Sequence, residues 1–203
     1  INGMVLGEDG FKMSKSRDNV IGPEDVMGPY GVDALRQWAA AGSSTGQDIL
    51  FNWNDVVAAS RFQTKMWNIV RFSLSQIQKE SPVPKTDAPS TLIDRWMLAN
   101  LSKTVADVTE AMESYLFDKG LKIVRDFAWN VMADEYLEFV KGRLYSEEPE
   151  RAGAVYTLET TLDAICTMLS PYIPFFAQEC YHHLSGGKRI IDHPWTTFSF
   201  DDE

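Results

Sequence analysis

The longest uninterrupted helical pattern in the chain is NDVVAASRFQTKMWNIVRFSLSQIQK, residues 54–79. Its mostly apolar stripe recurs at three- and four-residue intervals, which is the period of an α-helix that buries one face. The stripe consists of Phe62, Met66, Ile69, Val70, Ser73 and Ile77. Two prolines at positions 82 and 84 end the pattern, because proline cannot continue a helix. One long amphipathic helix is therefore expected here.

Four more helical patterns follow, at residues 89–114, 117–144, 151–169 and 174–184. The breaks between them are short, so consecutive helices should lie side by side and antiparallel. The sequence thus predicts a mainly α fold, with residues 51–203 forming an antiparallel helical bundle.

The sequence of residues 1–50 lacks long helical patterns and predicts a small α+β module. Two short apolar runs flank the Asp9-Gly10 pair, which indicates a β-hairpin over residues 4–13. Pro23 followed by two acidic residues indicates a helix start, since proline suits the first helical position and acids suit the positive end of the helix dipole. A second short helix is expected over residues 31–41.

The net charge of −10 argues against non-specific binding of nucleic acids, which requires positive charge to displace the counterions of the phosphates. Any nucleic-acid site must therefore be a local basic patch. The two cysteines, Cys166 and Cys180, lie in apolar segments with a helical pattern and outside any CxxC motif. Free buried thiols are expected rather than a disulfide or a zinc site. No apolar run approaches the roughly 18 residues that span a membrane.

The string Lys12-Met13-Ser14-Lys15-Ser16 is the motif that carries chemistry. Two lysines three residues apart on a loop can surround one polyphosphate, while the serines add small hydroxyl donors. Such a loop could stabilise the charge that grows on a departing pyrophosphate and could close during the reaction. The alternative is a solvated loop that happens to contain two lysines.

The text around this string, GEDGFKMSKSRDNVIGPEDVMGPYGVDALRQWAA at residues 7–40, resembles the KMSKS region of class I aminoacyl-tRNA synthetases for branched aliphatic amino acids. One departure is Asp18, where that family usually has glycine. Glycine permits a positive φ, and aspartate tolerates it better than most residues do. Asp18 also places a negative charge beside a phosphate-binding loop.

Later segments resemble the valine branch of this family, notably GQDI at 46–49, KGRLY at 141–145 and LSPYIPF at 169–175. The resemblance implies ATP, with Mg²⁺, as a substrate of the intact enzyme, together with valine and valine tRNA. It implies that Lys12 and Lys15 are catalytic and that residues 12–16 bind ATP. It also implies a KMSKS and stem-contact module at 1–50 and an anticodon-binding domain at 51–203.

Further expectations follow from the same resemblance. The chain is expected to be part of a longer enzyme and inactive alone, because no second class I motif is present. It is expected to be monomeric, cytoplasmic and without a metal site or a membrane contact. Two alternatives are a part of an isoleucine enzyme, and a stand-alone helical RNA-binding module.

The helix at 54–79 is basic in an acidic protein, which makes it the candidate RNA-binding element. Arg61, Lys65, Asn68 and Phe72 are spaced by four, three and four residues, so they share one narrow face. An aromatic ring can stack on an unpaired base, cations can hold phosphates and an amide can read base edges. The alternative is that Phe72 packs on a neighbouring helix among solvated charges. Asn54 is a weaker candidate at the helix start.

Other conspicuous side chains are expected to be structural. Trp96, Trp129, Tyr136 and Phe139 recur at helical spacing and predict core packing. The acids of segment 134–138 predict an exposed helix face, and no base partner for His193 is evident from the sequence.

Overall fold

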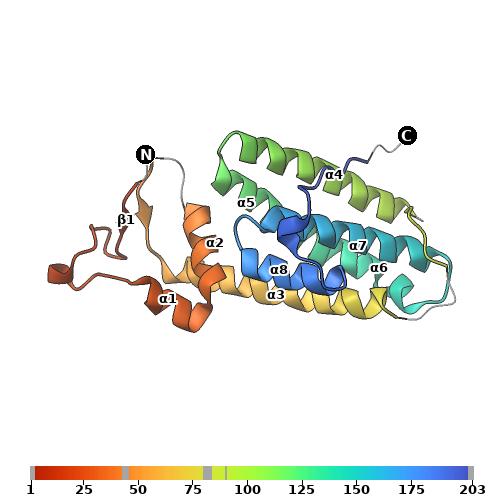
Figure 1. Ribbon diagram of the computed structural model, residues 1–203, viewed down its shortest axis with the longest axis horizontal. Helices are drawn as coiled ribbons and strands as arrows, with labels where there is room; N and C mark the ends of the chain where they lie inside the picture. The colour runs from red at the N-terminus through yellow and green to blue at the C-terminus, as the bar shows by residue number, and fades with distance from the viewer. Residues whose placement is uncertain (1–2, 43–45, 80–83, 90, 201–203) are drawn as a thin grey trace.

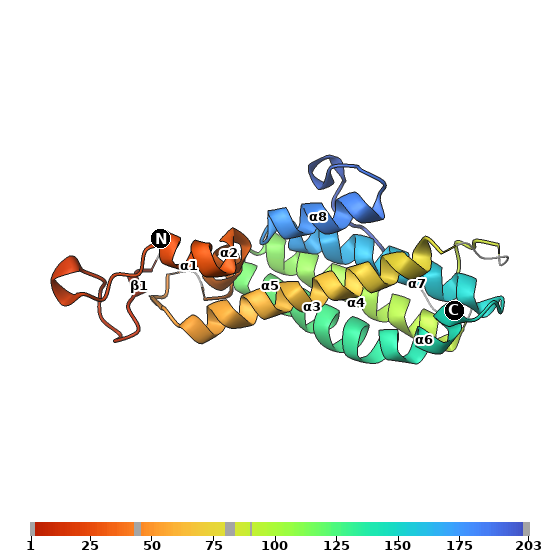
Figure 2. The same cartoon turned by 90° about the horizontal axis from the view of Figure 1, so that it is seen from below.

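The computed structural model describes residues 3–42, 46–79, 84–89 and 91–200. A small N-terminal module lies at one end of an elongated helical bundle, and α3, Trp53–Ile77, runs from the module along the bundle (Figures 1 and 2). This confirms the mainly α fold. The boundary drawn between residues 50 and 51 stays a prediction.

The bundle contains the helices expected from the sequence, with small shifts of their ends. They are α4 Leu92–Glu113, α5 Phe117–Asp126, α6 Leu137–Tyr145, α7 Glu150–Leu169 and α8 Pro174–Leu184. The central helix is α7, which buries most of its side chains on all sides and contacts α3, α4, α6 and α8. A helix that is largely apolar around its circumference is stable only inside such a packed core.

The rod predicted over residues 117–144 is continuous, but its middle differs from an α-helix. Phe127–Tyr136 is π-helical, and the N–H of Leu137 accordingly bonds to the carbonyl of Met132 five residues earlier. A π-helical segment rotates the side chains that follow it relative to a regular helix. Tyr136 is fully buried as expected, and Trp129 packs against the core with part of its ring exposed. The expectation for Phe139 was wrong, because 61% of this residue is exposed.

The N-terminal module is built from α1, Pro23–Tyr30, and α2, Val32–Gly42, against a two-stranded sheet. Strand β1, Val5–Leu6, pairs in parallel with β2, Ile49–Leu50. The predicted hairpin was therefore largely wrong: only one antiparallel bridge, between Leu6 and Lys12, follows the turn at Gly10. The polar residues after Met13 offer no apolar side chains to extend a second strand there.

Two side chains of α2 tie the module to the corner between α7 and α8. Asp33 accepts a hydrogen bond from the backbone N–H of Phe176 at 2.6 Å, in the first turn of α8. Arg36 donates to the carbonyls of Tyr172 and Pro171 at 3.1 and 3.2 Å. Burial raises the pKa of Asp33, and its bond to Phe176 acts in the opposite direction. A charged residue pair therefore fixes the module on the bundle.

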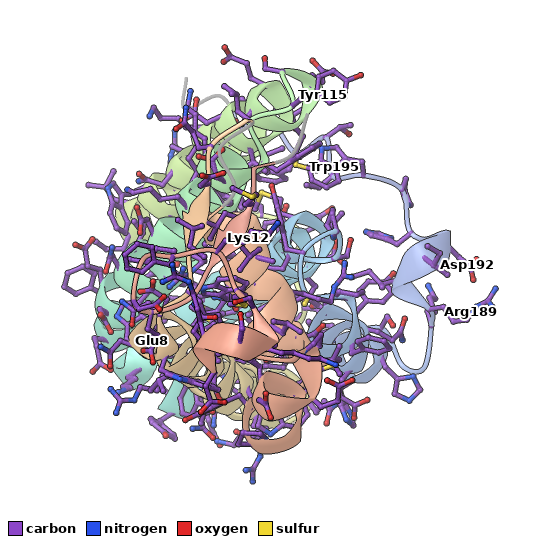
Figure 3. The ribbon with its side chains drawn as sticks, turned by 90° about the vertical axis from the view of Figure 1, so that its left-hand side faces the viewer. Glu8, Lys12, Tyr115, Arg189, Asp192 and Trp195 are labelled. Carbon is purple, nitrogen blue, oxygen red and sulfur yellow. The ribbon has the colours of Figure 1, made fainter. Side chains whose placement is uncertain are left out.

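Residues 185–200 pack along the bundle after α8 and include a short 3₁₀ turn, Ile190–Asp192. Figure 3 shows Arg189 and Asp192 at the outer edge of this segment, where they form an ion pair of 2.8 Å. Trp195 lies nearer the helices and donates from Nε1 to Thr109. His193, for which the sequence suggested no partner, lies 3.1 Å from Asp163.

Both cysteines are buried and free, as expected. The hydrogen bond between the two thiols, together with burial, raises the pKa of Cys166. In the described part of the chain, no helix has both the length and the apolar character required to cross a membrane.

A buried polar network joins α4, the π-helical segment and α6. The Asp94 carboxylate is inaccessible and accepts hydrogen bonds from Tyr136 at 2.7 Å and from Arg143 at 2.8 and 2.6 Å. It also forms a capping box with Thr91 at the start of α4. Burial raises the pKa of Asp94, but the bonds from Arg143, Tyr136 and Thr91 outweigh burial and lower it overall.

We predict that Asp94→Ala destabilises the protein by about 3–5 kcal/mol, because it leaves Arg143 without its buried partner. Chemical denaturation measures this loss, and Asp107→Asn on the exposed side of α4 serves as control, with a change within about 0.5 kcal/mol.

The lowered pKa of Asp94 also predicts a pH dependence. The stability that Asp94 contributes is present above its ordinary pKa of 3.8 and is lost as pH falls further. If wild type and Asp94→Asn lose the same stability as the pH falls below 3.8, this prediction is wrong.

Candidate functional site: a lysine-containing loop and a helical groove

The loop of residues 12–16 lies at the free end of the N-terminal module, which faces the viewer in Figure 3. Lys12 and Lys15 are exposed, and Met13 packs against the module core. Lys15 begins a single 3₁₀ turn, Lys15–Arg17, and the hydroxyls of Ser14 and Ser16 are 3.2 Å apart. Both ammonium groups are thus available to an anionic ligand.

Asn19 holds this loop closed on itself. Its Oδ1 accepts the backbone N–H of Ser14 at 2.8 Å, and its Nδ2 donates to both carboxylate oxygens of Asp9 at 3.1 Å. The same amide group reaches the Lys12 carbonyl at 3.4 Å. The N–H of Phe11, followed by the amide of Asn19, lowers the pKa of Asp9. We call Asp9 and Asn19 the loop clamp.

Two backbone features lie beside the loop clamp, and the first makes room for it. A Cβ on Gly7 would lie 2.9 Å from the Asp9 carboxylate and 3.1 Å from the Asn19 amide, so a larger residue would displace them. Asp18 has φ 53° and ψ 30°, the left-handed conformation anticipated for this position. The sequence presented Asp9 as a turn residue and Asn19 only within the stretch 7–40 that carries the family resemblance, and their mutual contact was missed.

The candidate RNA-binding residues of α3 do come together. Arg61, Lys65, Asn68 and Phe72 line one open groove, whose other wall is formed by Leu137 and Lys141 of α6. Asn54 lies apart, because the 18 residues that separate it from Phe72 correspond to about 27 Å of helix. The structure therefore places four of the five candidates in one groove, which we call the α3–α6 groove.

Lys65 is held in place in this groove. Its Nζ lies 2.7 Å from Asp134 and 3.7 Å from the centre of the Trp129 ring. Trp129 in turn stacks on Phe62 of the core, with 6.3 Å between ring centres. The acidic face around Asp134 thus positions a cation, a role that the sequence did not indicate.

Phe72 has two environments. One side of the ring packs against the bundle core and meets the edge of Tyr145, with 6.2 Å between ring centres. The other side lines the α3–α6 groove and leaves the residue half-buried. Packing on a neighbouring element and availability to a ligand are therefore compatible.

The chain matches two family models. Residues 94–203 match the anticodon-binding domain of tRNA ligase, and residues 1–52 match the class I tRNA synthetases for I, L, M and V. Among curated relatives, a valine–tRNA ligase of Methanosarcina acetivorans is 52% identical over 91% of this chain and 22% of its own length. A valine–tRNA ligase of Archaeoglobus fulgidus is 48% identical over 100% of this chain and 24% of its own. The chain thus spans less than a quarter of the length of these relatives.

A solved structure supports the fold alone. The ternary complex LeuRS-tRNA-LeuAMS from Agrobacterium radiobacter superposes with a TM-score of 0.74 at 19% identity. The superposition covers 97% of this chain and 23% of that one.

We predict that Asn19→Ala opens the lysine-containing loop without unfolding the protein. Loss of its hydrogen bonds, at about 0.5–1.5 kcal/mol each, should speed tryptic cleavage after Lys12, Lys15 and Arg17 by roughly tenfold. Limited trypsin digestion with mass spectrometry measures the rate at each site.

Gly7→Ala should have a similar effect, and Asn68→Ala, an exposed asparagine on α3, should have none. Equal cleavage rates in wild type and Asn19→Ala would show that the loop clamp does not restrain the loop.

Proposed function

The chain belongs to the class I tRNA ligases that carry this anticodon-binding domain, and on that premise we propose that it is the KMSKS-loop and anticodon-binding part of a valine–tRNA ligase. The parent enzyme would activate valine with ATP, releasing pyrophosphate, and then esterify the tRNA 3′ end. The relatives at about half identity support valine over isoleucine. The match of residues 1–52 to a synthetase model argues against a stand-alone RNA-binding module.

We propose that residues 12–16 bind the ATP phosphates, with Lys12 and Lys15 as the catalytic pair. Both ammonium groups are exposed on one short loop, so they can gather around the pyrophosphate as negative charge develops on it. The loop clamp would set the resting conformation from which the loop closes. Across the residues that the structure describes, no three His, Cys, Asp or Glu side chains cluster to hold a metal ion. We propose that Mg²⁺ arrives with ATP as part of the substrate.

The observation that carries the RNA-binding proposal is the α3–α6 groove. It gathers Arg61, Lys65 and Lys141 on a protein whose net charge is −10. Phe72 offers a half-exposed ring for stacking and Asn68 an exposed amide for a base edge. We propose that this groove binds the anticodon region of valine tRNA. Asn54 would meet a different part of the RNA, nearer the module.

We also propose that the enzyme acts as a monomer in the cytoplasm. Its free buried thiols suit a reducing compartment.

We predict that Phe72→Ala weakens binding of a valine anticodon stem-loop by about 1–3 kcal/mol, or roughly 5- to 150-fold, since one stacking surface is lost. Adding Lys65→Ala should weaken binding further. Fluorescence anisotropy at fixed salt measures the affinity, and circular dichroism reports the helical content.

Phe139→Ala is the matched control, because this exposed aromatic residue of α6 is not part of the groove lining. Equal affinities of wild type and Phe72→Ala would place the RNA site elsewhere. Tighter binding of an isoleucine stem-loop would favour the isoleucine enzyme.

We further predict that the purified 203-residue chain forms no valyl-tRNA, because it spans less than a quarter of its relatives. A filter assay with labelled valine tests this, and measurable product above a no-protein blank would contradict it.

A further inference from the structure

A second cavity lies where the N-terminal module meets the bundle. It has a volume of about 270 Å³ and lies between α2, α3 and α5. Its polar lining consists of Gln37 of α2, Asp55 of α3 and Arg125 of α5, against walls that include Trp38 and Ala59. We call this cavity the junction pocket. None of its residues belongs to the lysine-containing loop or to the α3–α6 groove.

The junction pocket contains hydrogen-bonding groups that are buried and unpaired. The Nε of Arg125 is inaccessible and has no partner among the described residues. Gln37 accepts a bond from Gln63 through Oε1, while its Nε2 is buried and unpaired. The unpaired group of Gln37 is therefore a donor. Because an unpaired buried polar group is costly, both side chains are suited to a ligand that supplies acceptors.

Arg125 is also a partly buried cation without an ion pair among the described residues. Its guanidinium lies 5.4 Å from the ring centre of Phe62, and burial lowers its pKa. Asp55 and Asp126 act in the opposite direction on that pKa without a direct contact. Arginine presents a rigid fork of donors that matches the oxygens of a phosphate. The chemistry of the pocket therefore favours one phosphate group.

The junction pocket and the α3–α6 groove lie along one seam. Asp55 and Ala58 line the pocket. The groove is lined by Arg61, Lys65, Asn68 and Phe72, and all six residues recur at three- or four-residue steps on α3. On the facing helix, Arg125 contacts Phe62, which stacks on Trp129, which contacts Lys65. Ala58 and Phe72 are 14 residues apart, or about 21 Å along the helix. One extended polyanion could thus reach both sites.

We propose that the junction pocket binds one backbone phosphate of the tRNA, with Arg125 and Gln37 as its donors. This inference rests on the proposed function, since it requires that the α3–α6 groove binds RNA. It adds a contact that reads no base and fixes the position of the RNA relative to the module. Asp55 limits the affinity of the pocket, because its carboxylate lies in the same lining.

The test measures binding of a valine tRNA transcript to the 203-residue chain over a series of salt concentrations. Arg125→Met should weaken binding by about 10- to 100-fold, the loss of a charge-assisted hydrogen bond. It should also reduce the salt slope by about 1, as expected for one lost phosphate contact. Gln37→Leu should weaken binding by less and leave the slope unchanged. Arg125→Lys, which keeps the charge without the fork, should recover the slope and only part of the affinity.

Asp55→Asn should change the tRNA affinity in the opposite direction to Arg125→Met. It removes a negative charge from the pocket and should tighten tRNA binding several-fold, which a destabilised protein would not do. Lys103→Met and Asp107→Asn, an exposed pair on α4, are the matched charge controls and should leave the affinity nearly unchanged. Thermal unfolding of each variant checks that the fold is retained.

Phosphate-ethylation interference locates the contact. In wild type, ethylation of one particular tRNA phosphate should block binding. Ethylation of the same phosphate should have no effect on binding to Arg125→Met, whereas it should still block binding to Phe72→Ala. If Phe72→Ala weakens binding while Arg125→Met and Asp55→Asn do not change it, the inference is wrong and the proposed function stands. If wild type binds no tRNA, both are wrong. If inorganic phosphate raises the melting temperature but Arg125→Met binds tRNA normally, the pocket holds a free anion and the inference is again wrong.

Discussion

The structure depends on one helix that belongs to two hydrophobic cores. The first turns of α3 place Val56 and Ala59 in the core of the N-terminal module, with Trp38 and Phe51. Its later turns place Phe62 and Ile69 in the core of the bundle. Because a helix of this length is a stiff rod, the two cores cannot move independently along it. The α3–α6 groove and the junction pocket are both positioned by this shared element.

The shared helix also explains how an acidic protein can present a surface for RNA. The inward stripe of α3 is used for packing, so its cations are confined to the outward face. Lys65 on this face is held by Asp134 and Trp129 of the facing rod, and Arg125 of that rod contacts Phe62 of α3. Held cations lose less side-chain entropy on binding than free ones, which suits a site that must position a ligand. The π-helical segment belongs to this seam because it contains Trp129.

The lysine-containing loop is held in a different way from the α3–α6 groove. Its ammonium groups are exposed, and its backbone is restrained by side chains that lie outside the motif. The loop clamp holds the loop at Lys12 and Ser14 through one amide, so a small number of hydrogen bonds separates a held loop from an open one. A loop of this kind can change conformation at low cost, whereas the α3–α6 groove is built on rigid helices. The two halves of the chain are thus suited to different tasks.

The sequence by itself determined the helices and the shared face of Arg61, Lys65, Asn68 and Phe72, because helical periodicity is a local property. It also anticipated the left-handed conformation of Asp18, which depends on one residue's backbone. Only the tertiary structure decided which distant segments meet. Four features depend on such long-range contacts. They are the pairing of β1 with β2, the contact of Asn19 with Asp9, the exposure of Phe139, and the unpaired donors of Arg125 and Gln37. Contacts between residues far apart in the chain are set by how the cores pack, and no local pattern of residues encodes them.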